Sequence, residues 1–350
     1  MKIKNLVRKN IVNLKPYTSA RDENSSGILL DANENSLGST FNEIKDLNLN
    51  RYPDPNQNDL RDLISAYLDV SKENLFFGVG SDEIIDLLIR IFCEPGKDKI
   101  LIPEPTYGMY KVTADINNVP AVRVLLNDDF QIDLKEINKN FTRDIKIIFL
   151  CSPNNPTGNL LRKDDVLGLC KKNNSIVIVD EAYIDFAESF SLINEVGNYP
   201  NLVVMRTFSK AWGLAGARLG YCVANEEIVK ILFKVKAPYN INSLTRFALG
   251  KALNNVKLKN SYVKTIIKER EKLKKELLLL AGVSKVFDSD ANFLLIKCTN
   301  SKTILKKLAE RKIIIRDRST QPKLEGCLRI SVGTKEENKI LLNALKGILK

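Results

Sequence analysis

The feature that most constrains the fold of this chain is a series of short apolar runs that alternate with segments of helical period. The runs are apolar at nearly every position, which is typical of strands buried on both faces of a sheet. Strands that alternate with helices predict an α/β fold with a mainly parallel central sheet. The predicted strands are Leu75–Gly78, Lys99–Ile102, Ala121–Leu125, Lys146–Cys151, Ile176–Val179 and Leu202–Met205, and the predicted helices between and before them are Asp59–Leu68, Ser81–Cys93 and Asp164–Lys171.

The last third of the chain repeats this alternation with fewer strands and predicts a smaller α/β domain. A long helical segment over about 244–279 is expected to join the two domains. Thr334-x-x-Glu337 forms a capping box that predicts the start of a final helix. The other predicted elements are the strands Leu294–Lys297, Ile313–Arg316 and Cys327–Val332, the helix Thr303–Glu310 and a short helix near Phe41–Leu47. We expect an N-terminal arm over 1–40, a large domain over 41–243 and a small C-terminal domain over 244–350.

Composition restricts the chemistry that the chain can perform. It contains no histidine, which excludes Ser-His-Asp and Cys-His nucleophile systems, histidine–metal sites and a histidine general base. An enzyme with this sequence must use Lys, Tyr, Asp, Glu or Cys for proton transfer. The six cysteines form no C-x-x-C pair, so we predict no metal site and expect buried, reduced thiols.

The chain is basic, because 54 Lys and Arg residues against 42 Asp and Glu residues give a net charge of +12. Such a charge suits phosphorylated substrates, nucleic acid or an anionic membrane. Much of it lies between Lys251 and Lys275, where apolar residues recur at helical spacing, and we interpret it as the solvated face of a helix. The basic start lacks the apolar region of a signal peptide and no apolar stretch is long enough for a membrane span, so we expect a cytoplasmic protein.

Two motifs follow predicted strands and place polar groups at the carboxyl edge of the sheet, where open α/β folds bind ligands. Gly78-Val-Gly-Ser-Asp-Glu83 opens a helix, so its backbone N–H groups form either an anion site or an ordinary helix cap. Ser152-Pro-Asn-Asn-Pro-Thr-Gly158 forces a sharp turn, which either is structural only or presents Asn155 to a ligand.

Two further motifs carry charged groups after buried strands. Asp180 ends one strand, and a buried carboxylate there requires a cation, which is either a structural Arg or Lys or the protonated nitrogen of a cofactor. Tyr183 is close enough along the chain to reach the same site. Lys210 follows another strand between hydroxyl residues, with Arg218 eight residues later, and is either a solvated turn lysine or a Schiff-base lysine. Together, the motifs suit pyridoxal phosphate, which requires a lysine, a carboxylate for its ring nitrogen and a phosphate-binding cradle.

The order and spacing of these motifs resemble the fold-type-I aminotransferases that use pyridoxal phosphate, and within them the histidinol-phosphate aminotransferases. The resemblance extends over almost the whole chain. It is carried by Lys15-Pro-Tyr17, Leu30-Asp-Ala-Asn-Glu-Asn35, Arg51-Tyr-Pro-Asp-Pro55, Pro105-Thr-Tyr107, Pro153-Asn-Asn-Pro-Thr-Gly158, Asp180-Glu-Ala-Tyr183, Arg206-Thr-Phe-Ser-Lys210, Ile314-Ile-Arg316 and Leu328-Arg-Ile-Ser-Val-Gly333.

The resemblance implies a role for each matching residue. Lys210 would form the internal aldimine and move the proton, Asp180 would hold the protonated ring nitrogen, and Tyr183 would contact the ring hydroxyl together with Asn155. Tyr107 would stack on the ring, and a dimer partner would supply Tyr52, which makes a homodimer the expected state. The phosphate would lie among Ser81, Asp82, Thr207, Ser209 and Arg218, and the substrate among Tyr17, Asn33, Tyr52, Arg316 and Arg329.

The implied reaction is the transamination of L-histidinol phosphate with 2-oxoglutarate, which gives imidazole acetol phosphate and L-glutamate in histidine biosynthesis. An alternative keeps the cofactor and changes the reaction, either to decarboxylation of phosphothreonine or phosphoserine or to transamination of another phosphorylated ketone or an aromatic keto acid. A third hypothesis, a basic binding module for nucleic acid, leaves the residues around Lys210 unexplained, and we expect no nucleic-acid or membrane partner.

Overall fold

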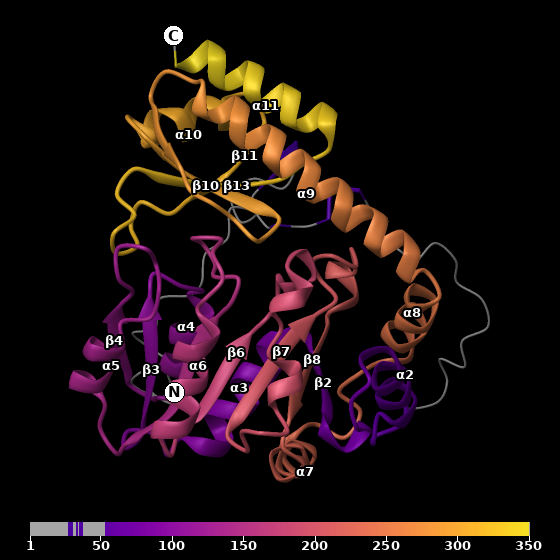
Figure 1. The fold of residues 1–350 in the computed structure, drawn as a ribbon. Helices are drawn as coiled ribbons and strands as arrows, with labels where there is room; N and C mark the ends of the chain where they lie inside the picture. Colours follow the sequence, from indigo (N-terminus) through magenta and orange to yellow (C-terminus); the bar gives the residue numbers. More distant parts are fainter. Residues whose placement is uncertain (1–26, 31–32, 34, 38–52, 350) are drawn as a thin grey trace, which may run out of the picture.

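The structure is a computed structural model that describes residues 27–30, 33, 35–37 and 53–349. This part of the chain forms a large body around a seven-stranded sheet and a smaller body around a four-stranded sheet, and helix α9 (Val256–Leu278) extends from one to the other (Figure 1). The predicted α/β fold is therefore confirmed. The division at 40, 243 and 244 stays a prediction.

The seven-stranded sheet is mainly parallel, as predicted. Its strand order is β2-β8-β7-β6-β5-β3-β4, and β8 runs antiparallel to the other described strands of this sheet. On β6, Val177 and Val179 face one apolar cluster and Ile178 faces the other, and all three are fully buried. The bounds are β2 Leu75–Val79, β3 Lys99–Glu104, β4 Ala121–Leu125, β5 Ile145–Cys151, β6 Ile176–Asp180, β7 Leu202–Thr207 and β8 Leu219–Ala224.

Helices cover both faces of this sheet, which explains why its strands are apolar throughout. Residues of α3 (Gly80–Phe92), α4 (Met109–Ile116) and α7 (Glu226–Val235) pack on the face of Ile178. The opposite face packs against α2 (Asn58–Leu68), α5 (Leu134–Asn140), α6 (Lys163–Lys172) and α8 (Ser243–Leu253).

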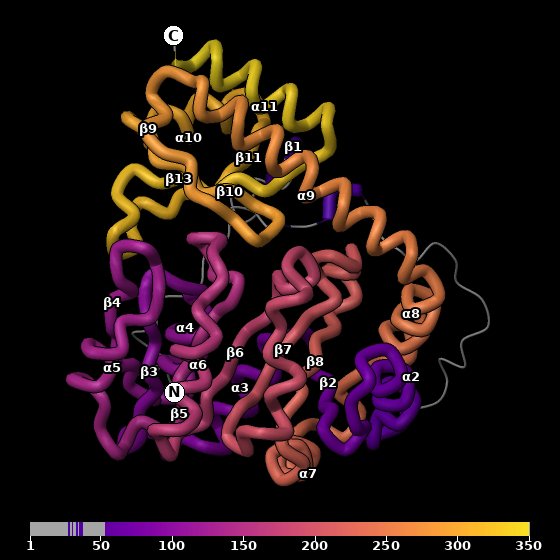
Figure 2. The backbone as a smooth tube through the Cα atoms, viewed as in Figure 1, coloured from indigo at the N-terminus to yellow at the C-terminus, as the bar shows by residue number. Residues whose placement is uncertain are grey.

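The smaller body turns one face of its sheet toward the large body. Its order is β12-β13-β10-β9, and on β13 Leu328 and Ile330 join a core with α9, α10 and α11, whereas Arg329 lies on the opposite face and reaches the large body. Figure 2 shows β1 (Ile28–Leu29) beside β11 (Ile313–Ile314), with which it pairs in parallel. The other bounds are β9 Val283–Val286, β10 Phe293–Cys298, α10 Ser301–Glu310, β12 Arg316–Asp317, β13 Cys327–Ser331 and α11 Lys335–Ile348.

Two predicted elements differ in the structure. The helical segment over 244–279 is two helices, because the polar pair Asn254 and Asn255 ends α8, where the Asn255 side chain bonds the carbonyl of Lys251 in competition with the helix. The strand predicted over Ile313–Arg316 is divided into β11 and β12, which belong to different sheets. Five further elements of the structure have no counterpart among the predicted ones, namely α4, α5, α7, β8 and β9.

Other predictions have mixed outcomes. The capping box at Thr334 and Glu337 is confirmed, and all six cysteines are buried and free of disulfides. The helix predicted near Phe41–Leu47 lies outside the described residues. Within the described ranges no helix is long and apolar enough to cross a membrane. The predicted cytoplasmic location stays a prediction.

Candidate active site

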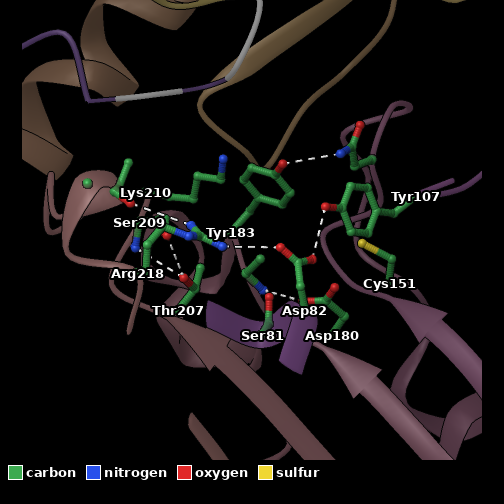
Figure 3. A pocket seen from close by; sticks show the side chains of 14 residues that line it. Ser81, Asp82, Tyr107, Cys151, Asp180, Tyr183, Thr207, Ser209, Lys210 and Arg218 are labelled. Carbon is green, nitrogen blue, oxygen red and sulfur yellow. Dashed lines mark hydrogen bonds and ion pairs between the residues drawn. The ribbon is translucent and has the colours of Figure 1, made fainter. Parts of the chain in front are cut away.

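A cavity of about 370 Å³ lies where β5, β6 and β7 end and α3 begins. These strands are parallel neighbours, so the residues that follow them meet at one edge of the sheet (Figure 3). All predicted cofactor residues except Tyr52 line this cavity, namely Ser81, Asp82, Tyr107, Asn155, Asp180, Tyr183, Thr207, Ser209, Lys210 and Arg218.

Asp180 is the buried carboxylate of this cavity, with 3% of its surface exposed. Its Oδ2 accepts a hydrogen bond of 2.7 Å from the Tyr110 hydroxyl, and its Oδ1 accepts one of 3.0 Å from the Ala182 N–H. Burial raises the pKa of Asp180 to about 6, although both hydrogen bonds favour the ionised form. No ion pair among the described residues involves this carboxylate, whereas the adjacent Glu181 binds Arg206.

Tyr183 connects the large body to the small body through its hydrogen bonds at one side of the cavity. Its hydroxyl accepts hydrogen bonds of 3.2 Å from the side-chain amides of Asn155 and Asn33. The side-chain carbonyl of Asn155 in turn accepts a hydrogen bond from Arg329 on β13. Asn33 is held by Ser331, which lies on the same strand as Arg329. Burial raises the pKa of Tyr183 to about 12, so the hydroxyl is neutral here.

The start of α3 forms the opposite end of the cavity, where two glycines lie too close to their neighbours for a side chain to fit without a shift. Gly80 has a φ of +71°, and a Cβ there would lie 2.5 Å from Nη2 of Arg218. A Cβ on Gly220 would lie 2.4 Å from the Ser81 nitrogen. The first-turn N–H groups of this 13-residue helix therefore stay close to Arg218, and the combination is typical of a phosphate site.

Side chains complete this anion-binding end. The Thr207 and Ser209 hydroxyls are 2.9 Å apart and buried, and Arg218 pairs with Asp82 at 3.2 Å. Tyr107 donates a hydrogen bond of 3.3 Å to Asp82, which holds the tyrosine ring at the side of the cavity (Figure 3). Lys210 is partly buried, with its Nζ 5.8 Å from the centre of the Tyr183 ring.

The predicted substrate residues have different outcomes. Asn33 and Arg329 do not line the cavity themselves but hydrogen-bond two residues that do, Tyr183 and Asn155. Arg316 lies opposite Arg329 in the ladder of β12 and β13 but is not among the residues that line the cavity. Tyr17 and Tyr52 lie outside the described residues.

The sequence analysis missed three polar contributors to the site. Tyr110 binds Asp180, Ser331 binds Asn33, and the Asn292 side chain donates to the Asn33 carbonyl at 2.8 Å. A signal was present for Ser331, because it follows Arg329 by two residues on a strand, and this spacing places both side chains on one face.

These residues fit pyridoxal phosphate. The buried Asp180 without an ion pair suits a protonated ring nitrogen, and the donors at the start of α3 suit a phosphate group. A lysine amine and a tyrosine ring line the space between the two ends. Such an arrangement can hold an aldehyde cofactor and move a proton beside it.

Comparisons with known proteins give a consistent result. The family model for class I and II aminotransferases matches residues 25–345. The histidinol-phosphate aminotransferase of Cytophaga hutchinsonii is 50% identical over 343 residues, which cover 97% of each chain. The crystal structure of the histidinol-phosphate aminotransferase from Clostridium acetobutylicum has a TM-score of 0.83 and 28% identity, and the match covers 92% of this chain and 98% of that chain.

A second solved structure is similar in fold alone. The histidinol-phosphate aminotransferase from Sinorhizobium meliloti, in complex with pyridoxal-5'-phosphate, has a TM-score of 0.87 at 22% identity, and the match covers 98% of this chain and 97% of that chain.

Proposed function

From the premise that this chain belongs to the class I and II aminotransferases, and within them to the histidinol-phosphate aminotransferases, we propose that it transfers the amino group of L-histidinol phosphate to 2-oxoglutarate. The products are imidazole acetol phosphate and L-glutamate, which places the enzyme in histidine biosynthesis. The observation that carries the proposal is the cavity that joins the buried carboxylate of Asp180 to the amine of Lys210.

Pyridoxal 5'-phosphate supplies an electron-accepting ring that stabilises the charge left when a proton departs from the substrate carbon. Asp180 keeps a proton on the ring nitrogen, since a buried carboxylate without an ion pair favours a cationic partner. Lys210 would hold the cofactor through its amine, and the same amine would move the proton of the substrate carbon. Tyr183 and Asn155 orient the ring hydroxyl.

The phosphate of the cofactor is held at the start of α3. Ser81 and Asp82 contribute backbone N–H groups, and Thr207, Ser209 and Arg218 contribute side-chain donors. The ring of Tyr107 packs against one face of the cofactor ring and limits the orientations that it can adopt.

The substrate is held from the small body. Arg329 lies with its guanidinium beside Asn155, where it is placed to bind the carboxylate of glutamate or 2-oxoglutarate. Arg316 and Tyr17 bind the phosphorylated end of the substrate, the partner-supplied Tyr52 also contacts the substrate, and Asn33 belongs to the arm that closes over it. These five roles rest on the resemblance of the motifs, and the contact of Arg329 with Asn155 supports the first of them.

The experiment that tests the reaction measures L-glutamate released by the purified protein from L-histidinol phosphate and 2-oxoglutarate. L-Phosphothreonine and L-phenylalanine are assayed in parallel. Glutamate release from L-histidinol phosphate alone supports the proposal, whereas CO₂ release from L-phosphothreonine without glutamate replaces it with the decarboxylase alternative. The control is Lys210→Ala, which keeps its thermal unfolding transition and loses turnover by about 10⁴-fold or more.

The proposed assembly is a homodimer that forms next to the phosphate-binding end of the site. Val79 and Leu244, 41% and 46% exposed, line an open cavity of about 490 Å³ that also includes Gly216 and Arg218. A second copy on this apolar surface buries both side chains beside the active site.

The variant Leu244→Glu tests the homodimer. It places a charge in the proposed interface, so we expect light scattering to give the mass of a monomer and activity to fall with dimer content. Leu279→Glu is the matched control, because Leu279 is 78% exposed on the small body, and it keeps the dimer. A Leu244→Glu dimer would reject this interface.

A further inference from the structure

Tyr110 is the largest fully buried side chain that contacts the cavity residues without lining the cavity itself. It lies in the first turn of α4, stacked on Phe149 with ring centres 4.7 Å apart and planes 8° apart. The edge of its ring meets Tyr107 at 5.5 Å. A phenylalanine would make both ring contacts, so packing does not account for the hydroxyl.

The hydroxyl has a specific partner, because it donates a hydrogen bond of 2.7 Å to Oδ2 of Asp180. Tyr110 therefore contacts two side chains of the proposed cofactor site: Asp180, assigned to the ring nitrogen, and Tyr107, assigned to the ring face. The stacking on Phe149, which is itself fully buried on β5, fixes the direction in which the hydroxyl points.

The charges around Asp180 explain why this hydrogen bond is needed. Burial and the nearby Asp82 carboxylate on α3 favour the neutral acid. The Tyr110 hydroxyl, the Ala182 N–H and the Lys210 ammonium group favour the carboxylate, and the tyrosine has the largest effect of these three. Among the described residues, Cys151 on β5 and Tyr183 also interact with Asp180, and burial raises the pKa values of both so that they stay neutral.

We propose that Tyr110 is a positioning residue that orients the Asp180 carboxylate and keeps it ionised for the cationic ring of the cofactor. The hydrogen bond occupies one lone pair of Oδ2 and leaves the second free for a donor in the cavity. The consequence for catalysis rests on the proposed function, while the pairing of Tyr110 with Asp180 is a property of the apoprotein alone.

The first experiment therefore uses cofactor-free protein. The raised pKa of Asp180 makes the unfolding free energy of the apoprotein fall as the pH rises from about 4 to about 6. In Tyr110→Phe the Asp180 carboxylate loses its strongest hydrogen bond, so the pKa of Asp180 rises further. We therefore expect the unfolding free energy to keep falling for about one further pH unit. Each profile is compared with that of the same protein carrying Asp180→Asn, because burial also raises the pKa of Glu181. Tyr221→Phe is the control, since Tyr221 is a buried tyrosine of the opposite sheet face beside Arg206, and this change leaves the Asp180 midpoint in place.

A Tyr110→Phe profile that ends at the same pH as the wild type overturns the proposal. Should the variant not fold, the wild-type apoprotein labelled with ¹³C at tyrosine Cζ provides the test. A Tyr110 resonance that titrates with the midpoint of the Asp180 carboxyl resonance supports the pairing, and a resonance that does not move between pH 4 and 8 rejects it.

The second experiment measures the dissociation constant of pyridoxal phosphate in a double-mutant cycle. Tyr110→Phe weakens binding by about 10-fold to 100-fold in the wild-type background and has little effect when Asp180→Asn is already present. Equal losses in both backgrounds mean that the tyrosine acts through packing only and overturn the proposal. A wild-type protein that does not bind the cofactor refutes the proposed function, and the apoprotein titration still decides the pairing.

Discussion

Asp180 and Glu181 are adjacent carboxylates at the end of β6, buried to 3% and 2% exposure, and they have opposite environments. Asp180 faces α3 and α4 and receives hydrogen bonds from Tyr110 and the Ala182 N–H. Glu181 faces the other side of the sheet, where Arg206 Nε lies 3.0 Å away and the Ser191 hydroxyl and the Leu192 N–H complete its hydrogen bonds.

The two carboxylates have different roles: Glu181 stabilises the fold, whereas Asp180 is available to a ligand. A buried charge costs free energy unless a partner compensates it, and Glu181 has that partner within the chain. Arg206 lies next to Thr207 at the end of β7, and Glu181 comes directly after Asp180, the last residue of β6. The ion pair between Arg206 and Glu181 therefore fixes the two strand ends that carry the site. Asp180 has no ion pair among the described residues, and the Lys210 ammonium group acts on it only as the weakest of the attractions that favour its charge, so the carboxylate is left for a cationic bound molecule.

The variant with the largest expected effect is Asp180→Asn. The amide cannot keep a proton on the ring nitrogen of the cofactor, so we expect kcat/KM to fall by about 10³-fold or more. Glutamate release measured at saturating pyridoxal phosphate checks this value and separates it from weaker cofactor binding. Activity within 10-fold of the wild type would mean that Asp180 is a structural carboxylate like its neighbour.

Arg206→Met tests the structural role of the ion pair between Arg206 and Glu181. It leaves the buried Glu181 without its cation, and we expect the unfolding free energy to fall by about 3–5 kcal/mol. Urea unfolding of the apoprotein at pH 7 measures the loss.

The matched control for Arg206→Met removes both charges. Arg206→Met combined with Glu181→Leu replaces the ion pair with apolar groups, and such replacements are often close to neutral, so most of the lost stability returns. A double variant as unstable as the single one would mean that shape, and not charge, explains the loss.

The central sheet was predictable because its signal is local. Runs such as Ile176–Val179 are apolar at every position, and the structure buries them between two helical layers. β8 gave no such signal, because Leu219-Gly-Tyr-Cys-Val-Ala follows a glycine-rich motif that concealed its start. The divided helix at Asn254 and Asn255 was equally hidden, since charged residues on both sides suit either one helix or two.

The cavity residues were predictable only where a motif joined them to a strand end. Asp180, Asn155 and Lys210 each follow a buried run, and parallel strands bring those ends together. Tyr110 carries no such signal, because an aromatic residue on an apolar helix face has the same pattern whether or not its hydroxyl has a partner. Its contact with Asp180 joins residues 70 positions apart, which helical period does not reveal.

The smallest effect concerns pH, and it distinguishes the two carboxylates without any activity measurement. Asp180 has a pKa of about 6 in the folded protein against an ordinary value of 3.8, so between these values the folded state binds more protons than the unfolded state. Stability therefore falls as the pH rises through this window, and the loss amounts to about 3 kcal/mol when the carboxylate is fully ionised. Because burial also raises the pKa of Glu181, the contribution of Asp180 is obtained by subtracting the profile of Asp180→Asn.

Urea unfolding of the apoprotein at intervals from pH 4 to pH 7.5 gives both profiles. We expect wild-type stability to fall relative to Asp180→Asn over this range and the fall to shrink when pyridoxal phosphate is bound, because the cationic ring nitrogen compensates the charge. A fall that the cofactor leaves unchanged would show that Asp180 does not face the ring nitrogen. Asp180 and Glu181 would then differ only in the groups that they contact, and another residue of the cavity would have to hold the proton on the ring nitrogen.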